Sequence, residues 1–403
     1  MKISKIAQSI AESTTLKLNE TFGILKSQGE PVIHLGGGEP HGKAPLSALE
    51  KSLPLLEKRI VRYSPSAGTK ELREAVASYT EKYYDKKPEI KNIIISSGAK
   101  QALMVALQTI VDFGEEVLFP APFWVSYPEM VKLAGGIPVP VPLKNKNLQP
   151  EISDFEKKIT SKTRAILLNS PNNPSGVLYN REFIKEIIQY TKEKGIYLLM
   201  DDIYHRLLFD NKKHTPVLDF IEDIEQSHII IFNGISKTYA MTGFRIGWAI
   251  APSPIIKIMT NIQSHQTGGP SPLLQKAALG AITGPQDDVE TLRNTLNTHR
   301  DKMLKAISPL SKLHITKPDG TFYMFIDFSE YEPNSMKLAA LLLEKVKVLT
   351  MPGKPFGVEG YLRLSYCGAE NDIIEGIDRI VWALSAPKGS KKQIRNQTVE
   401  KDW

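Results

Sequence analysis

A lysine and an arginine follow one of the most apolar stretches of this chain. The run HIIIFN (228–233) predicts a buried strand of a parallel sheet. Lys237 comes four residues after it, and Arg245 comes eight residues after the lysine. Burial and nearby cations lower the pKa of an amine, and a neutral amine attacks carbonyl groups. Arg245 and Ser236 offer a planar cation and a hydroxyl that suit a phosphate group. Two solvated surface cations are the alternative, which fits poorly because the neighbouring residues are largely apolar.

Polar residues also follow three other apolar runs, at the positions where open α/β sheets bind ligands. The segment 98–100 follows NIIISS and opens a helix, whose N-terminus favours an anion, although serine and glycine there often serve only as a cap. Asn173 lies in the rigid turn PNNPSG after TRAILLNS, and the alternative is an ordinary loop. Asp201 ends the run IYLLMD, where a carboxylate needs a partner such as a protonated ring nitrogen. A helix N-cap is the alternative, and it suits Asp202 better.

These residue types together match the groups of one cofactor. An aldehyde for the lysine, a ring nitrogen for the aspartate and a phosphate for the serine, glycine and arginine describe pyridoxal 5′-phosphate. Arg363 lies in YLRLSYC, which alternates like a strand and has apolar neighbours. A guanidinium in that setting is either held in a structural ion pair or available to bind an anion.

Short apolar runs alternate with helical patterns between about residues 90 and 252. This order predicts an α/β fold, with a large domain whose mainly parallel seven-stranded sheet lies between helices. A smaller α+β domain built from both termini follows from a long helix at 285–310, the run GTFYMFIDF, a helix at 336–346, KVLTMPG and YLRLSYC. We expect the large domain at 45–300 and the small domain at 1–44 and 301–387. The N-terminal residues predict one amphipathic helix that joins the small domain.

Composition limits the class of protein. The chain has 403 residues, of which 41% are hydrophobic and 24% are charged, as in ordinary globular proteins. It has neither an apolar run long enough for a membrane span nor the apolar block of a signal peptide, so we expect a cytoplasmic protein. The net charge of +7 is densest in the tail 388–403, which we expect to be disordered rather than to bind nucleic acid. We expect no metal site because no metal-ligand spacing is present, and we interpret Cys367, the single cysteine, as a core residue.

Several motifs together resemble the class I/II pyridoxal-phosphate aminotransferases of fold type I, in particular their aspartate aminotransferase-like branch. The motifs are RYSPSAGTKELREAV, APFWVSYPEM, SPNNPSG, DDIYHRL, GISKTYAMTGFRIG and YLRLSYC, and the resemblance covers about residues 3–385. It implies that Lys237 attaches the cofactor and shuttles a proton. It also implies that the substrate α-carboxylate is held by Arg363, Gly38, Trp124 and Asn173. The cofactor contacts it implies are Gly98, Ala99, Lys100, Trp124, Asn173, Asp201, Tyr204, Ser236, Lys237, Arg245 and Tyr63.

The same resemblance implies a role for each contact. Asp201 pairs with the ring nitrogen, Tyr204 binds the ring oxygen, and Trp124 stacks on the ring. The segment 98–100, with the nearby hydroxyl and guanidinium, surrounds the phosphate. Tyr63 reaches the phosphate in a neighbouring subunit, so a homodimer with shared active sites is implied. The implied activity is ping-pong transfer of an amino group between an L-amino acid, either aspartate, glutamate or an aromatic one, and a 2-oxo acid.

Some positions depart from that family pattern, and other functions remain open. The stretch GGGEPHG (36–42) lacks the acid and the aromatic residue that often follow GEP in the family, and Gly234 stands where serine is common. These changes leave the substrate side chain open, and Lys17, Lys43 and Lys100 are equal candidates for a second carboxylate-binding cation. A lyase or synthase on the same cofactor would keep the same site. A non-catalytic ligand-sensing module is a more distant alternative.

Overall fold

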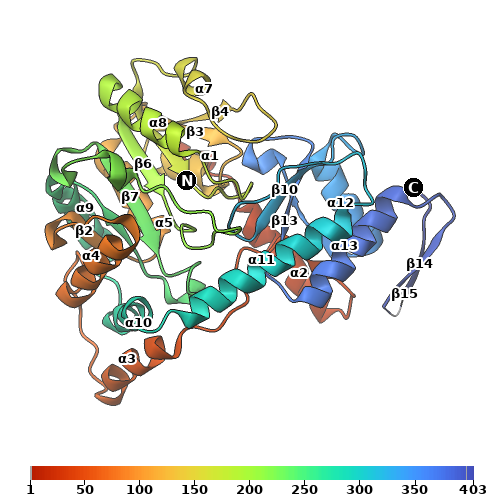
Figure 1. Ribbon diagram of the computed structural model, residues 1–403, viewed down its shortest axis with the longest axis horizontal. Coiled ribbons are helices and arrows are strands. Elements are labelled where there is room, and N and C mark those ends of the chain that lie inside the picture. The colour runs from red at the N-terminus through yellow and green to blue at the C-terminus, as the bar shows by residue number, and fades with distance from the viewer. Residues whose placement is uncertain (1, 396) are drawn as a thin grey trace.

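A seven-stranded sheet, here called the large sheet, forms the centre of the computed structural model, which describes residues 2–395 and 397–403 (Figure 1). Its order is β2-β8-β7-β6-β5-β3-β4, and within this sheet only β8 runs antiparallel to its neighbours. The strands are β2 (Ile93–Ser96), β3 (Glu116–Ala121), β4 (Ile137–Pro142), β5 (Thr163–Asn169), β6 (Tyr197–Asp201), β7 (Ile229–Gly234) and β8 (Gly247–Ile250). The predicted mainly parallel seven-stranded sheet is therefore confirmed.

Helices cover both faces of the large sheet because successive side chains of a strand point to opposite sides. Side chains such as Ile94 and Leu199 pack on one face against α5 (Ala99–Ile110), α6 (Ser126–Leu133) and α9 (Ser253–Gln266). Side chains such as Ile95 and Met200 pack on the other face against α4 (Lys70–Tyr84), α7 (Ile152–Glu156), α8 (Arg181–Lys194) and α10 (Pro272–Thr283). Because both faces are buried, most strands are continuous apolar runs that the sequence pattern can locate.

The pattern of apolar runs does not predict β4, whose sequence is IPVPVP. A proline has no N–H to donate to a neighbouring strand, so prolines in sheets are confined to edges. β4 lies at one edge of the large sheet and pairs only with β3 there. The three prolines therefore explain both why the strand is hard to recognise and why the sheet ends at this strand.

A second sheet of four strands, here called the small sheet, has the order β12-β13-β10-β9. Its strands are β9 (His314–Ile315), β10 (Tyr323–Asp327), β12 (Met351–Pro352) and β13 (Tyr361–Ser365), and they share a core with α12 (Ser335–Val346) and α13 (Glu370–Ser385). The early strand β1 (Ile33–His34) pairs with β11 (Val348–Leu349), so the start of the chain joins this part of the molecule. The long helix α11 (Asp287–Ile307) runs from beside α10 to α13 (Figure 1).

The remaining elements are short or peripheral. Helix α3 (Leu46–Glu57) packs against α10. The 3₁₀ helices are η1 (Ile90–Asn92), η2 (Val217–Phe220), η3 (Ile224–Gln226), η4 (Thr242–Phe244) and η5 (Lys354–Phe356). Within residues 2–395 and 397–403, no helix combines the length and the apolar character needed to span a membrane.

The N-terminal residues form two helices where the sequence predicted one. Each of α1 (Lys5–Ser9) and α2 (Thr14–Ser27) begins after a serine whose hydroxyl accepts a hydrogen bond from the backbone of that helix. The second serine cap restarts the helix after a break. Helix α1 packs on α6, where the N–H of Ala11 donates to Glu129 at 2.9 Å. The expectation that this segment joins the small domain is therefore wrong for α1, which lies against a helix of the large sheet.

The C-terminal tail forms a β-hairpin, so the expectation of disorder is wrong for the described residues of 388–403. Strands β14 (Lys391–Ile394) and β15 (Gln397–Glu400) pair antiparallel and project beside α13 (Figure 1). Residue 396 of this tail lies outside the described residues. The hairpin is a separate two-stranded sheet that joins neither the large nor the small sheet.

Partners on α13 explain the order of this basic hairpin. The Lys392 amine lies 2.7 Å from the carboxylate of Asp378, and the Trp403 ring meets the Trp382 ring edge-on at 5.8 Å. Charge runs in a sequence predict disorder when the charges repel and nothing buries apolar surface. Here acids on another element offset the basic charge, which composition alone cannot reveal.

Candidate active site

Lys237 lies three residues beyond the carboxyl end of β7, an inner strand of the large sheet. Its Nζ donates a hydrogen bond to the carbonyl of Gly38 at 2.7 Å and lies 5.8 Å from the centre of the Phe322 ring. Burial lowers the pKa of this amine to about 8, and the positive charges of Arg363 and Arg245 act in the same direction. The structure thus brings both predicted arginines near the predicted amine. A lower pKa leaves more neutral amine near neutral pH, which makes the group a better nucleophile.

Asp201 ends β6 and is only 6% exposed. The Tyr127 hydroxyl donates to its Oδ2 at 2.7 Å, and the N–H of Ile203 donates to its Oδ1 at 3.3 Å. Burial raises the pKa of this carboxyl to about 6, although the two hydrogen bonds oppose the rise. A buried carboxylate with two donors suits a ligand that brings a positive charge, such as a protonated ring nitrogen.

The neighbouring carboxylate of Asp202 points to the opposite face of the sheet, as strand geometry requires. It accepts a hydrogen bond from the Tyr84 hydroxyl on α4 at 3.1 Å and lies 3.3 Å from Nε2 of His214. It therefore belongs to a polar cluster behind the sheet and does not cap a helix, which corrects the alternative suggested for it. Of the two adjacent aspartates, only Asp201 lies on the side of α5 and α6.

Gly98 and Arg245 fit closely together at the start of α5. Gly98 has a φ of 88°, which glycine adopts without strain, and a Cβ there would lie 2.6 Å from Nη2 of Arg245. Arg245 has a left-handed φ of 51°, and its Nη1 donates to the carbonyl of Thr242 at 2.9 Å. A Cβ on Gly247 would overlap the nitrogen of Ala99. Because Gly98 and Gly247 have no side chains, the guanidinium of Arg245 can lie beside the N-terminus of α5. A guanidinium at a helix N-terminus suits a phosphate.

Gly234, which departs from the common family pattern, has a packing reason. A Cβ there would lie 2.9 Å from the Cα of Gly247, where β7 and β8 run side by side. A serine at this position would push the two strands apart. Ser236, which carries the nearby hydroxyl, is buried in the segment between β7 and Lys237.

Arg363 lies in the middle of β13 and is 2% exposed. Its Nη1 donates to Oδ1 of Asn173 at 3.0 Å, and its Nη2 donates to the carbonyl of Gly36 at 2.9 Å. The guanidinium carbon lies 4.1 Å from the centre of the Tyr323 ring. Within residues 2–395 and 397–403, its Nε has no hydrogen-bond partner and the side chain forms no ion pair. The geometry therefore favours an arginine available to an anion over the structural ion pair that the sequence left open.

Aromatic side chains form the wall between these groups. Nζ of Lys100 lies 4.7 Å from the centre of the Trp124 ring, which meets the Tyr127 ring edge-on at 5.4 Å. Tyr204 is buried and meets the Phe322 ring edge-on at 5.7 Å. The predicted ring-stacking residue thus lies between a lysine of α5 and the tyrosine that contacts Asp201.

Three predicted residues are not brought to this site within one chain. Tyr63 is fully exposed, so the role implied for it in a neighbouring subunit remains a prediction. Lys17 lies 3.0 Å from Glu12 on an exposed surface. Lys43 lines a separate hollow near α11.

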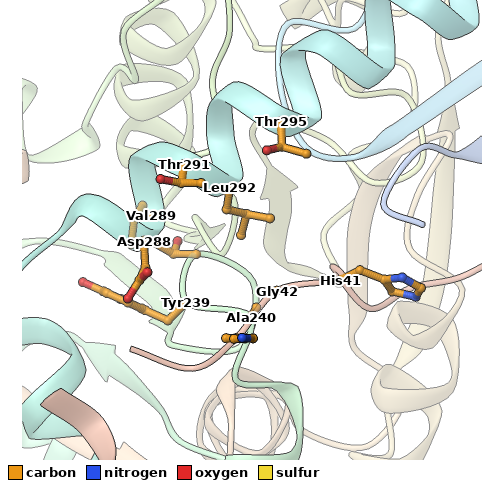
Figure 2. Close-up of a pocket in the computed structure, with 11 residues that line it drawn as sticks. His41, Gly42, Tyr239, Ala240, Asp288, Val289, Thr291, Leu292 and Thr295 are labelled. Carbon is orange, nitrogen blue, oxygen red and sulfur yellow. The ribbon is translucent and has the colours of Figure 1, made fainter. Parts of the chain in front are cut away.

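That hollow has a volume of about 240 Å³ and lies between α11 and two segments that leave the site, after Pro40 and after Lys237 (Figure 2). Figure 2 shows Leu292 pointing from α11 toward Gly42 and Ala240, and a Cβ on Gly42 would lie 2.9 Å from that of Ala240. The lining residues are His41, Gly42, Lys43, Thr238, Tyr239, Ala240, Asp288, Val289, Thr291, Leu292 and Thr295. Apart from Lys43, none was predicted to contact cofactor or substrate, so the hollow adjoins the candidate active site without forming part of it.

A family model described as aminotransferase class I and II matches residues 30–380. The chain belongs to this family. A probable aspartate/prephenate aminotransferase of Aquifex aeolicus is 37% identical, over 92% of this chain and 96% of the relative. An aspartate aminotransferase of Bacillus subtilis is 34% identical, over 94% of this chain and 98% of the relative. A solved aspartate aminotransferase of Thermus thermophilus with maleate superposes with a TM-score of 0.89 at 34% identity, covering 94% of this chain and 99% of that structure.

The protein is therefore an aminotransferase with the fold of these enzymes, and its family implies a pyridoxal 5′-phosphate cofactor. In this aminotransferase, two polar residues of the site escaped the sequence analysis. Asn169 accepts the N–H of Asn173 and donates to the carbonyl of Asp201, both at 2.7 Å. It ends the apolar run TRAILLN, so the rule that found Asp201 would also have found it.

Tyr127, the second missed residue, lies in the recognised motif APFWVSYPEM. Nothing in that motif indicates that its hydroxyl reaches Asp201, because the contact joins α6 to β6 across the fold. Tyr323 under Arg363 is a similar case, since it comes from a neighbouring strand of the small sheet.

Proposed function

We propose that pyridoxal 5′-phosphate is the cofactor of this aminotransferase and that Lys237 binds it. The available groups fit it: an amine with a pKa of about 8, a buried carboxylate with a pKa of about 6, and a guanidinium packed on a glycine at a helix start. Once bound, the cofactor supplies an aldehyde that exchanges for an amino group and a ring that accepts electron density. The proposed contacts are Gly98, Ala99, Lys100, Trp124, Asn173, Asp201, Tyr204, Ser236 and Arg245.

One observation carries the proposed transfer between amino acids and 2-oxo acids: Arg363 is a buried arginine with a free Nε and no carboxylate partner among the described residues. Amino acids and 2-oxo acids both carry a carboxylate next to the reacting carbon, so one guanidinium can hold either of them. Asn173 and the carbonyl of Gly36 fix the orientation of the planar group, at 3.0 and 2.9 Å. A guanidinium fixed in this way binds a carboxylate through two parallel hydrogen bonds.

Lys237 moves the proton in the proposed reaction. With a pKa of about 8, its Nζ is partly neutral near neutral pH. With the cofactor bound, it could take a proton from the substrate α-carbon and return it to the former aldehyde carbon of the cofactor. Asp201 would favour a positive charge on the ring nitrogen of the bound cofactor, because opposite charges stabilise each other in a buried site. The carbonyl of Gly38, which accepts a hydrogen bond from Nζ, orients the amine.

A substrate with two carboxylates fits best, because Lys100 provides a second cation beside the Trp124 ring. The relatives are named for aspartate or for prephenate, and both molecules carry two carboxylates. We propose aspartate with 2-oxoglutarate as the first pair, and prephenate or aromatic substrates as the second candidate. Lys100→Met keeps the backbone N–H of this residue, which is its proposed cofactor contact. It should raise the KM for aspartate about tenfold and leave that for phenylalanine unchanged. Equal effects on both substrates would remove Lys100 from this role.

The proposed assembly is a homodimer with shared sites. Apolar side chains gather on the exposed face of α3 and the segment after it: Leu46, Leu49, Leu53, Leu56, Ile60, Val61 and Tyr63. A contiguous exposed apolar surface of this kind is typical of a surface that another copy covers. Leu53→Glu should shift the protein from dimer to monomer in sedimentation experiments, and an unchanged mass would argue against this surface. A cytoplasmic location also remains a prediction from the sequence.

A single-turnover experiment tests the proposed function. Protein supplied with pyridoxal 5′-phosphate and then given only L-aspartate should release about one 2-oxo acid per chain and stop, until 2-oxoglutarate removes the stored amino group. A lyase or synthase would release product without this limit. Borohydride reduction should attach the cofactor to Lys237, and mass spectrometry of the peptides reads this out. Lys237→Ala should abolish both signals, whereas the exposed control Lys185→Ala should change neither.

A further inference from the structure

His34 lies on β1 and contacts both helix α2 and the backbone of Gly36. Its Nε2 lies 2.8 Å from Oδ1 of Asn19 on α2, and its Nδ1 lies 3.1 Å from the nitrogen of Gly36. Its ring packs on the Phe22 ring of the same helix, with 4.8 Å between the centres. The sequence analysis assigned no role to this residue.

The hydrogen bonds define which ring nitrogen of His34 carries the proton. A backbone N–H can only donate, so Nδ1 must accept from Gly36 and carries no proton. The proton is then on Nε2, where it faces the Asn19 oxygen. Burial lowers the pKa of this imidazole to about 4, and the positive charge of Arg363 acts in the same direction. The ring is therefore neutral near pH 7 and keeps Nδ1 available as an acceptor.

Gly36 makes hydrogen bonds with both His34 and Arg363. Its N–H is held by His34, and its carbonyl accepts from Nη2 of Arg363 at 2.9 Å. A glycine has the widest backbone freedom of any residue, and here two more glycines follow it. A side chain at this position would be crowded, because a Cβ would lie 3.1 Å from Leu349. The position thus favours a glycine, and the neighbouring imidazole supplies restraint that the backbone lacks.

We propose that His34 is a positioning residue for substrate binding: its Nδ1 holds the N–H of Gly36 and so restrains this glycine, whose carbonyl orients the guanidinium of Arg363 toward the substrate carboxylate. The inference rests on the proposed role of Arg363. It also assigns a task to α2, since Asn19 and Phe22 hold the imidazole in place. A ring that only filled space would not need an acceptor aimed at a backbone N–H two residues ahead.

Three substitutions of His34 separate the effect of the hydrogen-bond acceptor from that of the ring volume, and a fourth substitution changes Asn19. His34→Phe keeps an aromatic ring against Phe22 but removes the acceptor. His34→Asn restores an acceptor, because an asparagine oxygen commonly accepts from the N–H two residues ahead. His34→Ala removes both features. Asn19→Ala weakens only the support of the ring.

The readouts are steady-state kinetics with aspartate and calorimetric binding of succinate, a dicarboxylate with no amino group to react. We expect His34→Ala and His34→Phe to raise KM and the succinate Kd about tenfold, with kcat changed by less than about threefold. His34→Asn should stay within about threefold of the unmodified protein, and Asn19→Ala should fall between. A merely structural role would lower stability without this division between KM and kcat.

Two results would overturn the inference: succinate binding by His34→Phe that equals the unmodified protein, or a His34→Asn variant as weak as His34→Phe. If His34→Ala does not fold, succinate binding by His34→Phe and His34→Asn still tests the inference. Arg363→Leu separates this inference from the proposed function, because unchanged succinate binding in that variant would refute the arginine clamp itself. His228→Ala is a matched control, since that ring contacts Thr191 away from the site and should leave KM unchanged.

Discussion

Two buried arginines, Arg300 on α11 and Arg363 on β13, have opposite surroundings. Arg300 is fully buried, yet both its Nη atoms donate to the carboxylate of Asp210, at 3.1 and 3.0 Å, and its Nε donates to Asp301 at 2.9 Å. Arg363 is equally buried but has only an amide oxygen and a backbone carbonyl. A buried charge is expensive unless it is paired, so the first arginine supports the fold, whereas the second reserves its charge for a ligand.

The largest expected effect separates these two arginines. Arg363→Leu should raise the KM for amino acids about 100-fold, because a buried charge pair with the substrate carboxylate is lost, and should change the free energy of unfolding little. Arg300→Leu should lower the free energy of unfolding by about 2 kcal/mol and leave KM unchanged, with the cost reduced because Asp210 remains partly hydrated. Steady-state kinetics and urea unfolding of both variants measure this. A comparable loss of stability in both would contradict the distinction.

The comparison of paired and unpaired buried charges extends to Asp201, a buried carboxylate that we propose to pair with the positive charge of a ligand. Its folded pKa of about 6 lies above the usual 3.8, so its contribution to stability is present below pH 3.8 and is lost as pH rises through 6. Asp201→Asn removes this cost and should stabilise the cofactor-free protein by up to about 3 kcal/mol at pH 8. The gain should vanish at pH 4. The same variant should lower kcat by about two orders of magnitude, because stabilisation of the developing charge is lost.

Urea unfolding at pH 4 and pH 8 measures that gain, with kinetics on the same samples. A matched variant is Asp202→Asn, which alters the neighbouring carboxylate on the opposite face of the sheet. A destabilised Asp201→Asn variant at pH 8 would show that the folded chain already stabilises the charged carboxylate without the cofactor.

The third prediction concerns Lys237, and its expected effect is of intermediate size. Only the neutral amine reacts with an aldehyde, so the rate of pyridoxal 5′-phosphate attachment should rise about tenfold from pH 6 to pH 7 and level off above about pH 8. Because the charge of Arg363 helps to lower this pKa, Arg363→Leu should move the break to higher pH, and Arg300→Leu should not. Stopped-flow absorbance follows the attachment. A rate independent of pH would remove the lowered pKa from the mechanism.

The smallest effect concerns the partner of Arg300. Two cations lower the pKa of Asp210 to about 2, through hydrogen bonds from Arg300 and Lys317. A carboxyl with a lowered pKa contributes stability above its unfolded pKa of 3.8, and this contribution is lost as pH falls through 2. Because the carboxylate is 41% exposed, solvent screening limits the effect of Asp210→Asn to under about 1 kcal/mol at pH 7. Thermal melts at pH 7 and pH 2 should show the difference disappearing, and a persistent difference would point to packing.

The sequence predicts those site residues that obey a local rule. Lys237, Asp201 and Asn173 each follow an apolar strand, so the ends of parallel strands bring them together in the fold. Arg363 was found because a charge in an alternating apolar strand is unusual. Such rules need only a few neighbouring residues, which a single sequence provides.

Contacts between distant elements escaped these rules. The hydroxyl of Tyr127 reaches Asp201 on another element, and the imidazole of His34 is held by Asn19 of α2. No spacing in the sequence encodes either contact. The proline-rich β4 and the break before α2 were missed for a different reason, because local signals there oppose the regular patterns. The ordered tail depends on acids of α13, a tertiary effect that composition cannot report.

The C-terminal hairpin has a practical consequence for anyone who expresses this protein. After the hairpin, Trp403 packs on Trp382 of α13, and the amine of Lys401 donates to the carbonyl of Ala386 at 2.6 Å. An affinity tag fused directly after Trp403 would begin at a packed side chain and interfere with this docking. A purification handle at this end therefore needs a flexible spacer.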